Sequence, residues 1–124
     1  AIITGASRGL GLQMAQALAE QGAKLMLVAR KKENLQQALL TLKQFGTDCD
    51  YCASDISTEE GIEKVVQQTL SRFAEIDILI NNAGTTWGAN AVEYPVTAWD
   101  KVMQLNVRST FLLSQKVVQN VRVA

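Results

Sequence analysis

The sequence predicts a doubly wound parallel α/β sheet, of which it contains the first four β-α units and which is incomplete at both ends. Short apolar runs typical of strands alternate four times with longer segments of helical periodicity. These helical segments are long enough to connect neighbouring parallel strands, and the alternation is typical of a sheet covered on both faces. The chain has 124 residues, of which 48% are hydrophobic and 19% are charged, so we expect a single globular domain.

The chain begins with a strand, a glycine-rich turn and a helix. Residues 1–4 are expected to form the end of a strand, and because no methionine precedes them we expect the start of that strand to be missing. A turn with three glycines follows at residues 5–11. The next helix has apolar residues at four-residue spacing and ends at Gly22. A second strand at residues 24–29 is apolar on both faces, as expected inside a parallel sheet.

The middle of the chain repeats this alternation. Leucines at three- and four-residue spacing predict a helix that ends at Gly46, and a third strand is expected at residues 50–54. Ser57-Thr58-Glu59-Glu60 has the spacing of a capping box, which predicts Ser57 as the N-terminal cap of another helix. One face of that helix carries Ile62, Val66, Leu70 and Phe73.

The remainder of the chain is expected to hold a fourth strand at residues 77–81 and a long helix at residues 97–120. A loop at residues 84–96, which contains the only proline, connects the two. Apolar residues on the long helix cover more than one stripe, so the helix needs a packing partner beyond its own sheet.

Composition and charge exclude several classes of function. Twelve Lys and Arg residues balance twelve Asp and Glu residues, so the chain lacks the positive field that drives binding to nucleic acids or anionic membranes. No apolar run approaches the roughly 20 residues that span a bilayer. Histidine is absent, which removes Ser-His-Asp and Cys-His catalysis and nearly every common zinc site, so we expect no metal. Cofactor chemistry or binding remains.

Both cysteines lie in the segment Cys49-Asp50-Tyr51-Cys52, whose spacing also occurs in redox motifs. Such a motif normally has its first thiol at a helix N-terminus. Here the segment is expected to be a strand, which points the two cysteine side chains to opposite faces. We interpret them as reduced strand cysteines, which fits a cytoplasmic protein.

Gly5, Gly9 and Gly11 lie between a predicted strand and a predicted helix, with the spacing Gly-x-x-x-Gly-x-Gly. A turn there directs N–H groups and the positive end of the helix at whatever lies above the sheet, which favours a pyrophosphate. Gly5 permits a tight turn, and a glycine at position 9 or 11 permits close approach of the backbone. The alternative is a glycine-rich turn that binds no ligand.

Three consecutive cations follow the second predicted strand, in Ala29-Arg30-Lys31-Lys32. A dinucleotide-binding fold that prefers NAD has Asp or Glu at this point, where it contacts the ribose 2′-hydroxyl. Cations at the start of a helix oppose its dipole, and such a local conflict often marks function. Arg30, together with Arg8, is suited to hold a 2′-phosphate, which indicates NADP. A solvated basic helix start is the alternative.

Asp55 follows the third predicted strand, where ligands bind in open α/β sheets. Since Ser57 fits the role of helix cap, Asp55 is free to accept a hydrogen bond from an adenine amino group. A local turn closed by the Asp55 side chain is an equally good interpretation.

Three motifs together resemble the short-chain dehydrogenase/reductase family, and the similarity extends over the whole chain. They are Thr4-Gly5-Ala6-Ser7-Arg8-Gly9-Leu10-Gly11, Asp55-Ile56 and Asn81-Asn82-Ala83-Gly84. The resemblance implies that residues 1–124 are part of an NADP-binding domain with a Rossmann fold. It implies that the phosphates and ribose are bound by Gly5, Ser7, Arg8, Gly9, Leu10 and Gly11. It further implies that Arg30 binds the 2′-phosphate, that Asp55 and Ile56 bind the adenine, and that Asn82, Ala83 and Gly84 lie at the ribose region.

The catalytic group of that family is similar to Asn, Ser and Tyr-x-x-x-Lys, in which the tyrosine donates a proton as the hydride arrives. Asn106 in the long helix matches the asparagine. Because it is a poor helix former among apolar residues, we expect a buried amide that finds hydrogen-bond partners. A structural polar residue with no reactive role is the alternative.

The chain departs from the family pattern in one respect, because it contains no Tyr-x-x-x-Lys. Tyr51 precedes Cys52-Ala53-Ser54-Asp55, and Tyr94 precedes Pro95-Val96-Thr97-Ala98. We therefore expect the chain to be a piece of a longer enzyme and to be inactive by itself. The fourth strand is then expected to form an open apolar edge of the sheet.

The leading hypothesis is an NADP-dependent oxidoreductase that acts on a small carbonyl compound or a secondary alcohol. The loop at residues 85–90 is expected to border the substrate pocket, and with residues 92–103 it looks most like the ketone and 3-oxoacyl reductases of the family. Related enzymes use the long helix for subunit contacts, which implies a homodimer or homotetramer. The alternatives are a noncatalytic NADP-binding sensor or scaffold and, disfavoured by Arg30, a flavin or adenosylmethionine binder.

Overall fold

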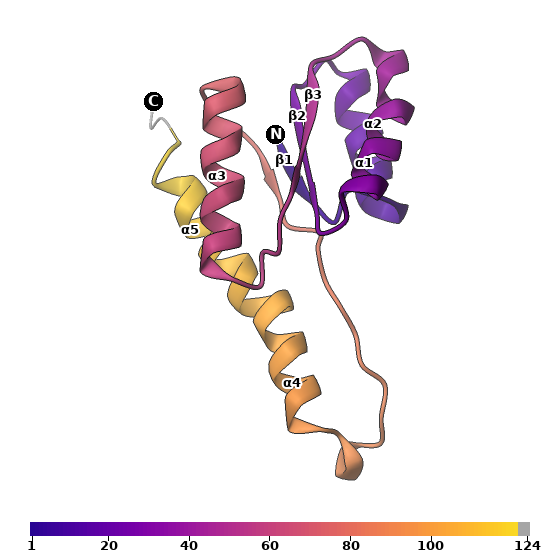
Figure 1. Ribbon diagram of the computed structural model, residues 1–124, viewed down its shortest axis with the longest axis vertical. Helices are drawn as coiled ribbons and strands as arrows, with labels where there is room; N and C mark the ends of the chain where they lie inside the picture. Colours follow the sequence, from indigo (N-terminus) through magenta and orange to yellow (C-terminus); the bar gives the residue numbers. More distant parts are fainter. Residues whose placement is uncertain (122–124) are drawn as a thin grey trace.

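The computed structural model describes residues 1–121, in which strands and helices alternate along the chain (Figure 1). The strands are β1 (Ile2–Thr4), β2 (Leu25–Ala29), β3 (Cys49–Ala53) and β4 (Leu79–Ile80). The α-helices are α1 (Gly9–Glu20), α2 (Lys32–Leu42), α3 (Glu59–Phe73), α4 (Val96–Met103) and α5 (Ser109–Val118). Two 3₁₀ turns, at Lys43–Phe45 and Ala91–Glu93, and a π-helical segment at Gln104–Arg108 complete the described chain.

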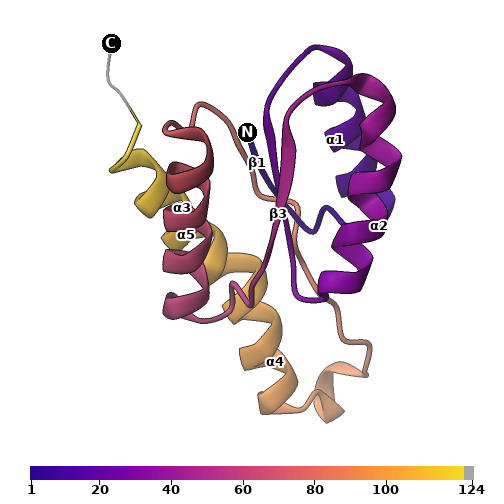
Figure 2. The same ribbon diagram turned by 45° about the horizontal axis from the view of Figure 1, so that its top comes forward.

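All four strands are parallel and lie in the order β3-β2-β1-β4. Helices α1 and α2 cover one face of the sheet, and α3 and α5 cover the other (Figure 2). The strand order reverses at β1, since the chain moves outward through β2 and β3 and then returns to the other side of β1 for β4. This arrangement confirms the doubly wound parallel fold.

The hydrophobic core is divided by the sheet into two clusters. Ile3 and Leu27 face α1 and α2, whereas Ile2 and Met26 face α3 and α5, and all four are almost fully buried. Successive strand residues therefore point to opposite faces and both faces are apolar, as the sequence predicts for an internal parallel sheet.

The two cysteines follow the same alternation. Cys49 packs against the cluster under α1 and α2, and the buried Cys52 belongs to the cluster under α3 and α5. Burial raises the pKa of the Cys52 thiol. Since the sheet separates the two sulfur atoms, the structure confirms plain strand cysteines.

Three predictions of local structure are wrong. The N-terminal cap of α3 is Thr58, whose hydroxyl accepts a hydrogen bond from Gly61 N–H at 3.0 Å, because the side chain of Ser57 is already bonded to Asp55. The fourth strand is shorter than residues 77–81, since β1 offers pairing partners only to Leu79 and Ile80. The long helix contains the π segment Gln104–Arg108 and is therefore not one continuous α-helix.

Strand β4 lies at the edge of the described sheet, where its apolar residues pair only with β1. The edge expected from the sequence is thus present in residues 1–121. Within these residues no helix is long and apolar enough to cross a membrane, and no cluster of His, Cys, Asp and Glu has the form of a metal site.

Candidate functional site

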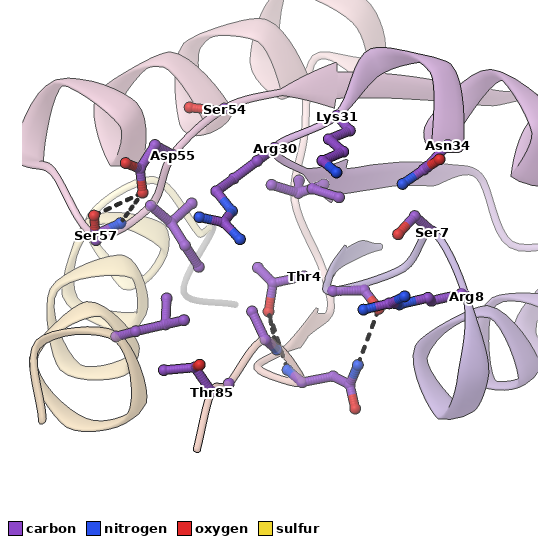
Figure 3. Close-up of a pocket in the computed structure, with 18 of the residues that line it drawn as sticks. Thr4, Ser7, Arg8, Arg30, Lys31, Asn34, Ser54, Asp55, Ser57 and Thr85 are labelled. Carbon is purple, nitrogen blue, oxygen red and sulfur yellow. Dashed lines mark hydrogen bonds between the residues drawn. The ribbon is translucent and has the colours of Figure 1, made fainter. Parts of the chain in front are cut away.

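A cleft of about 670 Å³ lies at the C-terminal ends of the four parallel strands. The segments that follow β1, β2, β3 and β4 each supply part of its wall (Figure 3). Of the site residues that the sequence predicts, ten line this cleft: Gly5, Ser7, Arg8, Gly9, Arg30, Asp55, Ile56, Asn82, Ala83 and Gly84. Leu10 and Gly11 lie in the first turn of α1 and Asn106 lies in the π segment, all three outside the lining.

The glycine-rich turn brings backbone N–H groups to one wall of the cleft. Gly5 and Gly9 have φ angles of 63° and 57°, a region that side chains with a Cβ rarely occupy. A Cβ added at Gly9 meets no atom within 4 Å, so the space beside this residue is open. Arg8, the residue that precedes α1, makes no side-chain capping bond to the helix. The open N-terminus of α1 is therefore suited to an anion.

Gly11 serves a different purpose from Gly9. A Cβ at Gly11 would lie 2.2 Å from the carbonyl oxygen of Gly5 and 2.5 Å from the amide nitrogen of Asn82. Glycine is thus required here because α1 packs directly against the turn. Gly11 shapes the site without lining it.

Thr4 joins two walls of the cleft, a role that the sequence analysis did not assign although Thr4 begins the first motif. Its hydroxyl oxygen accepts hydrogen bonds from the backbone N–H groups of Asn82 and Ala83, both at 3.0 Å. The amide of Asn82 in turn donates to the Gly5 carbonyl at 3.2 Å. Thr4 is almost fully buried, and its position in the motif and at the end of an apolar strand was the signal for this role.

Basic side chains gather on the α2 side of the cleft. Figure 3 shows Arg30 and Lys31, which connect β2 to α2, and Asn34 of α2 directed into the cleft, across from Ser7 and Arg8 of the glycine-rich turn. Within residues 1–121, neither arginine forms an ion pair. Two unpaired guanidinium groups in one cleft attract an anion. Asn34 also lines the cleft, and the sequence analysis did not identify it because it belongs to no motif.

Asp55 follows β3, the strand that pairs with β2, and therefore lies beside Arg30 (Figure 3). Its Oδ1 atom accepts hydrogen bonds from the Ser57 hydroxyl at 2.6 Å and from the Ser57 backbone N–H at 3.0 Å. The Ser57 hydroxyl, the Ser57 backbone and the charge of Arg30 together hold the pKa of Asp55 below its usual range. The turn closed by the Asp55 side chain therefore exists, and Oδ2 still makes no hydrogen bond within the described residues. One carboxylate oxygen thus remains for a ligand.

Gly61, which the sequence analysis also missed, sets the position of this turn. A Cβ at Gly61 would lie 1.8 Å from the Asp55 carbonyl oxygen. Only a glycine lets the first turn of α3 pack so closely against the segment that carries Asp55 and Ile56. The buried Ser54 side chain also donates to the Gly61 carbonyl at 2.7 Å.

Asn106 is exposed, so the prediction of a buried amide is wrong, although the expected hydrogen bonds are present. Its Oδ1 atom accepts from the Thr85 backbone N–H, and its Nδ2 atom donates to the Thr85 carbonyl, both at 2.8 Å. This pair of bonds fixes the loop that follows β4. A Cβ at Gly84 would lie 3.3 Å from Asn106 Oδ1, a tight contact that glycine avoids just before Thr85.

Comparison with known proteins assigns the chain to one family. Residues 1–122 match the family model described as short chain dehydrogenase. A Pseudomonas aeruginosa protein named rhamnolipids biosynthesis 3-oxoacyl-[acyl-carrier-protein] reductase is 43% identical over 122 residues, which are 98% of this chain and 47% of the relative. The chain therefore spans about half the length of this curated relative.

Two solved structures share the fold. A Pseudomonas aeruginosa active-site complex with NADP is 43% identical, with a TM-score of 0.89 over 94% of this chain and 45% of that chain. An NAD⁺-bound xylitol dehydrogenase is 29% identical, with a TM-score of 0.92 over 96% of this chain and 46% of that chain. The shared fold is therefore found with either nicotinamide cofactor.

Proposed function

Because the chain belongs to the short chain dehydrogenase family, we propose that it is part of the NADP-binding domain of an oxidoreductase. The proposed reaction transfers a hydride between NADP(H) and the carbon of a carbonyl or secondary alcohol group in a small molecule. One observation carries the choice of cofactor: Arg30 and Arg8 line a single cleft at the strand ends, without ion-pair partners in residues 1–121.

The choice of NADP over NAD rests on residues and not on the fold, since the structural neighbours include complexes with each. An NAD site has a carboxylate after the second strand, where it accepts from the ribose 2′-hydroxyl. Arg30 occupies that position here and suits a 2′-phosphate. Lys31 adds a further positive charge to the same wall.

The remaining residues of the cleft fit the rest of the cofactor. The open space beside Gly9 and the uncapped start of α1 suit the pyrophosphate. The free Oδ2 of Asp55 and the neighbouring Ile56 suit the adenine, the former as an acceptor for its amino group. We assign Asn82, Ala83 and Gly84 to the ribose region, because Thr4 and Asn106 hold this loop in place from two sides.

When bound, NADPH supplies the hydride. The role that we propose for Asn106 is to hold the Thr85 backbone and thereby the shape of the cleft where a carbonyl group would react. Hydride arrival creates negative charge on the carbonyl oxygen, which requires a proton donor. The 124 residues contain neither histidine nor Tyr-x-x-x-Lys, so we propose that the donor is supplied by other residues of the parent protein.

The substrate class that we favour is a ketone or a 3-oxoacyl compound. Support comes from the relative named as a 3-oxoacyl-[acyl-carrier-protein] reductase. The separated cysteines fit a reducing compartment, which supports a cytoplasmic location.

Apolar side chains support a homodimer or homotetramer formed through α4 and α5. Trp99, Met103, Val107 and Phe111 recur at four-residue spacing, and each is between 37% and 63% exposed. Such a contiguous apolar surface is typical of a subunit contact.

The test is to incubate the full-length protein with NADPH and a panel of ketones, 3-oxoacyl thioesters and sugars, and to follow the NADPH absorbance. Oxidation that depends on both protein and substrate, and that is slower with NADH, is the expected result. Tight NADPH binding without turnover on any substrate would instead favour the sensor or scaffold. Failure to bind NADPH would refute the proposal.

A further inference from the structure

The π segment Gln104–Arg108 contacts two separate walls of the cleft. On one side, Gln104 Nε2 donates to the Ser57 carbonyl at 2.7 Å, and Arg108 pairs with Glu59 at 2.8 Å. On the other side, Asn106 forms its two bonds to Thr85. Residues two apart on a helix point in nearly opposite directions, whereas residues four apart share a face. The alternation of residues 104, 106 and 108 thus explains how five residues reach both walls.

The bond from Gln104 ends on the residue that holds Asp55. Ser57 donates to Asp55 Oδ1 through its hydroxyl and its backbone N–H, and its own carbonyl receives the Gln104 amide. Gln104 and Ser57 both line the cleft. A continuous series of hydrogen bonds and one short backbone segment therefore leads from Asp55 to Thr85.

The backbone that connects Gln104 to Asn106 is itself fixed. Ser109 donates its hydroxyl to the Gln104 carbonyl at 2.8 Å, and Thr110 donates its hydroxyl to the Asn106 carbonyl at 3.1 Å. These side chains bind carbonyl groups in the wide turn of the π segment. The backbone on either side of residue 105 is therefore tied to α5 at both carbonyl groups.

We propose that Gln104 is a positioning residue that couples the adenine side of the cleft to the loop at Thr85. Binding of the adenosine half of the cofactor at Asp55 makes the Ser57 turn open less often. Because Gln104 is bonded to Ser57, the π segment then also moves less, and the Asn106–Thr85 pair opens less often. The inference rests on the proposed cofactor site and adds to it a communication between its two ends. A bond of this kind changes an opening equilibrium by roughly twofold to tenfold.

The probe is 2′,5′-ADP, which carries the adenine, ribose and 2′-phosphate of NADP and lacks the nicotinamide half. Amide hydrogen exchange at Ser57 and Thr85 is measured in the full-length protein with and without this ligand. The Thr85 N–H donates to Asn106 Oδ1, so its exchange requires that pair to open. In the wild type we expect 2′,5′-ADP to slow exchange at both residues, by roughly twofold to tenfold at Thr85.

Substitutions distinguish coupling from a general structural effect. Gln104→Leu keeps much of the side-chain bulk and removes the donor, so slowing should persist at Ser57 and disappear at Thr85. Gln104→Glu, a second variant for use if the leucine protein is unstable, should behave in the same way. Gln104→Lys restores a donor and should restore the effect. Gln68→Leu is the matched control, because Gln68 is exposed on α3, lies outside the cleft lining and makes no side-chain hydrogen bond within residues 1–121.

Two results would overturn the inference and leave the cofactor site intact: slowing at Ser57 but not at Thr85 in the wild type, or equal slowing at Thr85 in Gln104→Leu. Absence of slowing at both residues in the wild type means that 2′,5′-ADP does not bind there. That result would refute the proposed cofactor site and, with it, the coupling.

Discussion

Reversing the charge of Arg30 is the most direct test of cofactor choice. The side chain is exposed at the end of β2 and points into the cleft, so Arg30→Asp should leave the fold unchanged (Figure 3). The variant would lose the proposed charge-assisted hydrogen bond to the 2′-phosphate, a type of bond worth about 1.5–3 kcal/mol. A carboxylate about 4 Å from the phosphate adds repulsion of about 1 kcal/mol in a water-like dielectric, which is appropriate for an exposed group.

The two effects together amount to about 2.5–4 kcal/mol, which corresponds to a roughly 60-fold to 700-fold increase in the Kd for NADPH. The Kd for NADH should fall or stay constant, because a carboxylate at position 30 can accept from the ribose 2′-hydroxyl. The new charge also faces Asp55, whose pKa is lowered in part by Arg30, so that pKa should rise.

Isothermal titration of the full-length protein with NADPH and NADH measures both constants. Lys32→Asp is the matched control, since it makes the same charge change two residues away and outside the cleft lining. It should alter the Kd for NADPH by less than about threefold, because exposed charges are screened by salt. A change below tenfold in Arg30→Asp, or an equal change for both cofactors, would show that Arg30 does not contact the 2′-phosphate.

Four further results are expected. Gly11→Ala places a methyl group 2.2 Å from the Gly5 carbonyl oxygen, so the free energy of unfolding should fall by about 1–3 kcal/mol in thermal melts, whereas Gly88→Ala, with open space around it, should be neutral. The Ser57 hydroxyl lowers the pKa of Asp55 in the folded state, so the ionised carboxylate stabilises the fold at pH values above the ordinary Asp pKa of 3.8. This contribution is lost as the pH falls from 3.8 through the lower pKa of the folded state. Asp55→Asn should therefore flatten the loss of stability at acid pH in urea titrations, and an unchanged acid limb would contradict this. Phe111→Glu should convert the proposed full-length oligomer to smaller species in light scattering, and an unaltered mass would contradict a subunit contact through α5. Residues 1–124 alone should bind NADPH without turnover, since a positioned acid is worth about 10²–10⁴-fold in rate, and sustained oxidation would reveal an unidentified donor.

The fold was predictable because its strands and helices differ in hydrophobic period. The sequence places β1, β2 and β3 to within one residue, the first two from apolar runs, and apolar spacing of three or four residues predicts α1, α2 and α3. Gly46, which has a φ of 69°, ends the 3₁₀ extension of α2, and the sequence predicted this boundary from the glycine. The length of β4 was predicted wrongly, because a strand extends only where a neighbouring strand pairs with it. Nothing in residues 77–81 shows that β1 pairs with Leu79 and Ile80 alone.

The candidate site was predictable where its residues belong to a glycine pattern or follow a strand. Gly5, Gly9, Arg30 and Asp55 were identified in this way, and all four line the cleft. Residues that act through the backbone of another segment were missed, because their partners lie far away in sequence. Thr4 bonds to a loop about 78 residues later, and Gln104 reaches back 47 residues to Ser57.

The cap of α3 and the environment of Asn106 were mistaken for a related reason. A capping box identifies a set of candidate hydroxyls, but the sequence does not show that the Ser57 hydroxyl bonds to the Asp55 carboxylate while the Thr58 hydroxyl accepts from Gly61 N–H. Helical periodicity predicts a buried face for residue 106 only if the helix is uniform. The π segment changes the direction of that residue and leaves its amide exposed, paired with Thr85.

The π segment Gln104–Arg108 also depends on the number of residues in this part of the helix and not only on their identity. A π turn contains one residue more than the α turn it replaces. Loss of one residue between 104 and 108 would therefore let this turn close as a regular α turn, and the helix on either side of it would keep its direction. Leu113 and Val117 would continue to pack against the sheet, whereas Gln104 and Asn106 would lose the relative direction by which they reach Ser57 and Thr85. The extra residue therefore serves the walls of the cleft and not the hydrophobic core, whose contacts with α5 a regular α-helix would preserve.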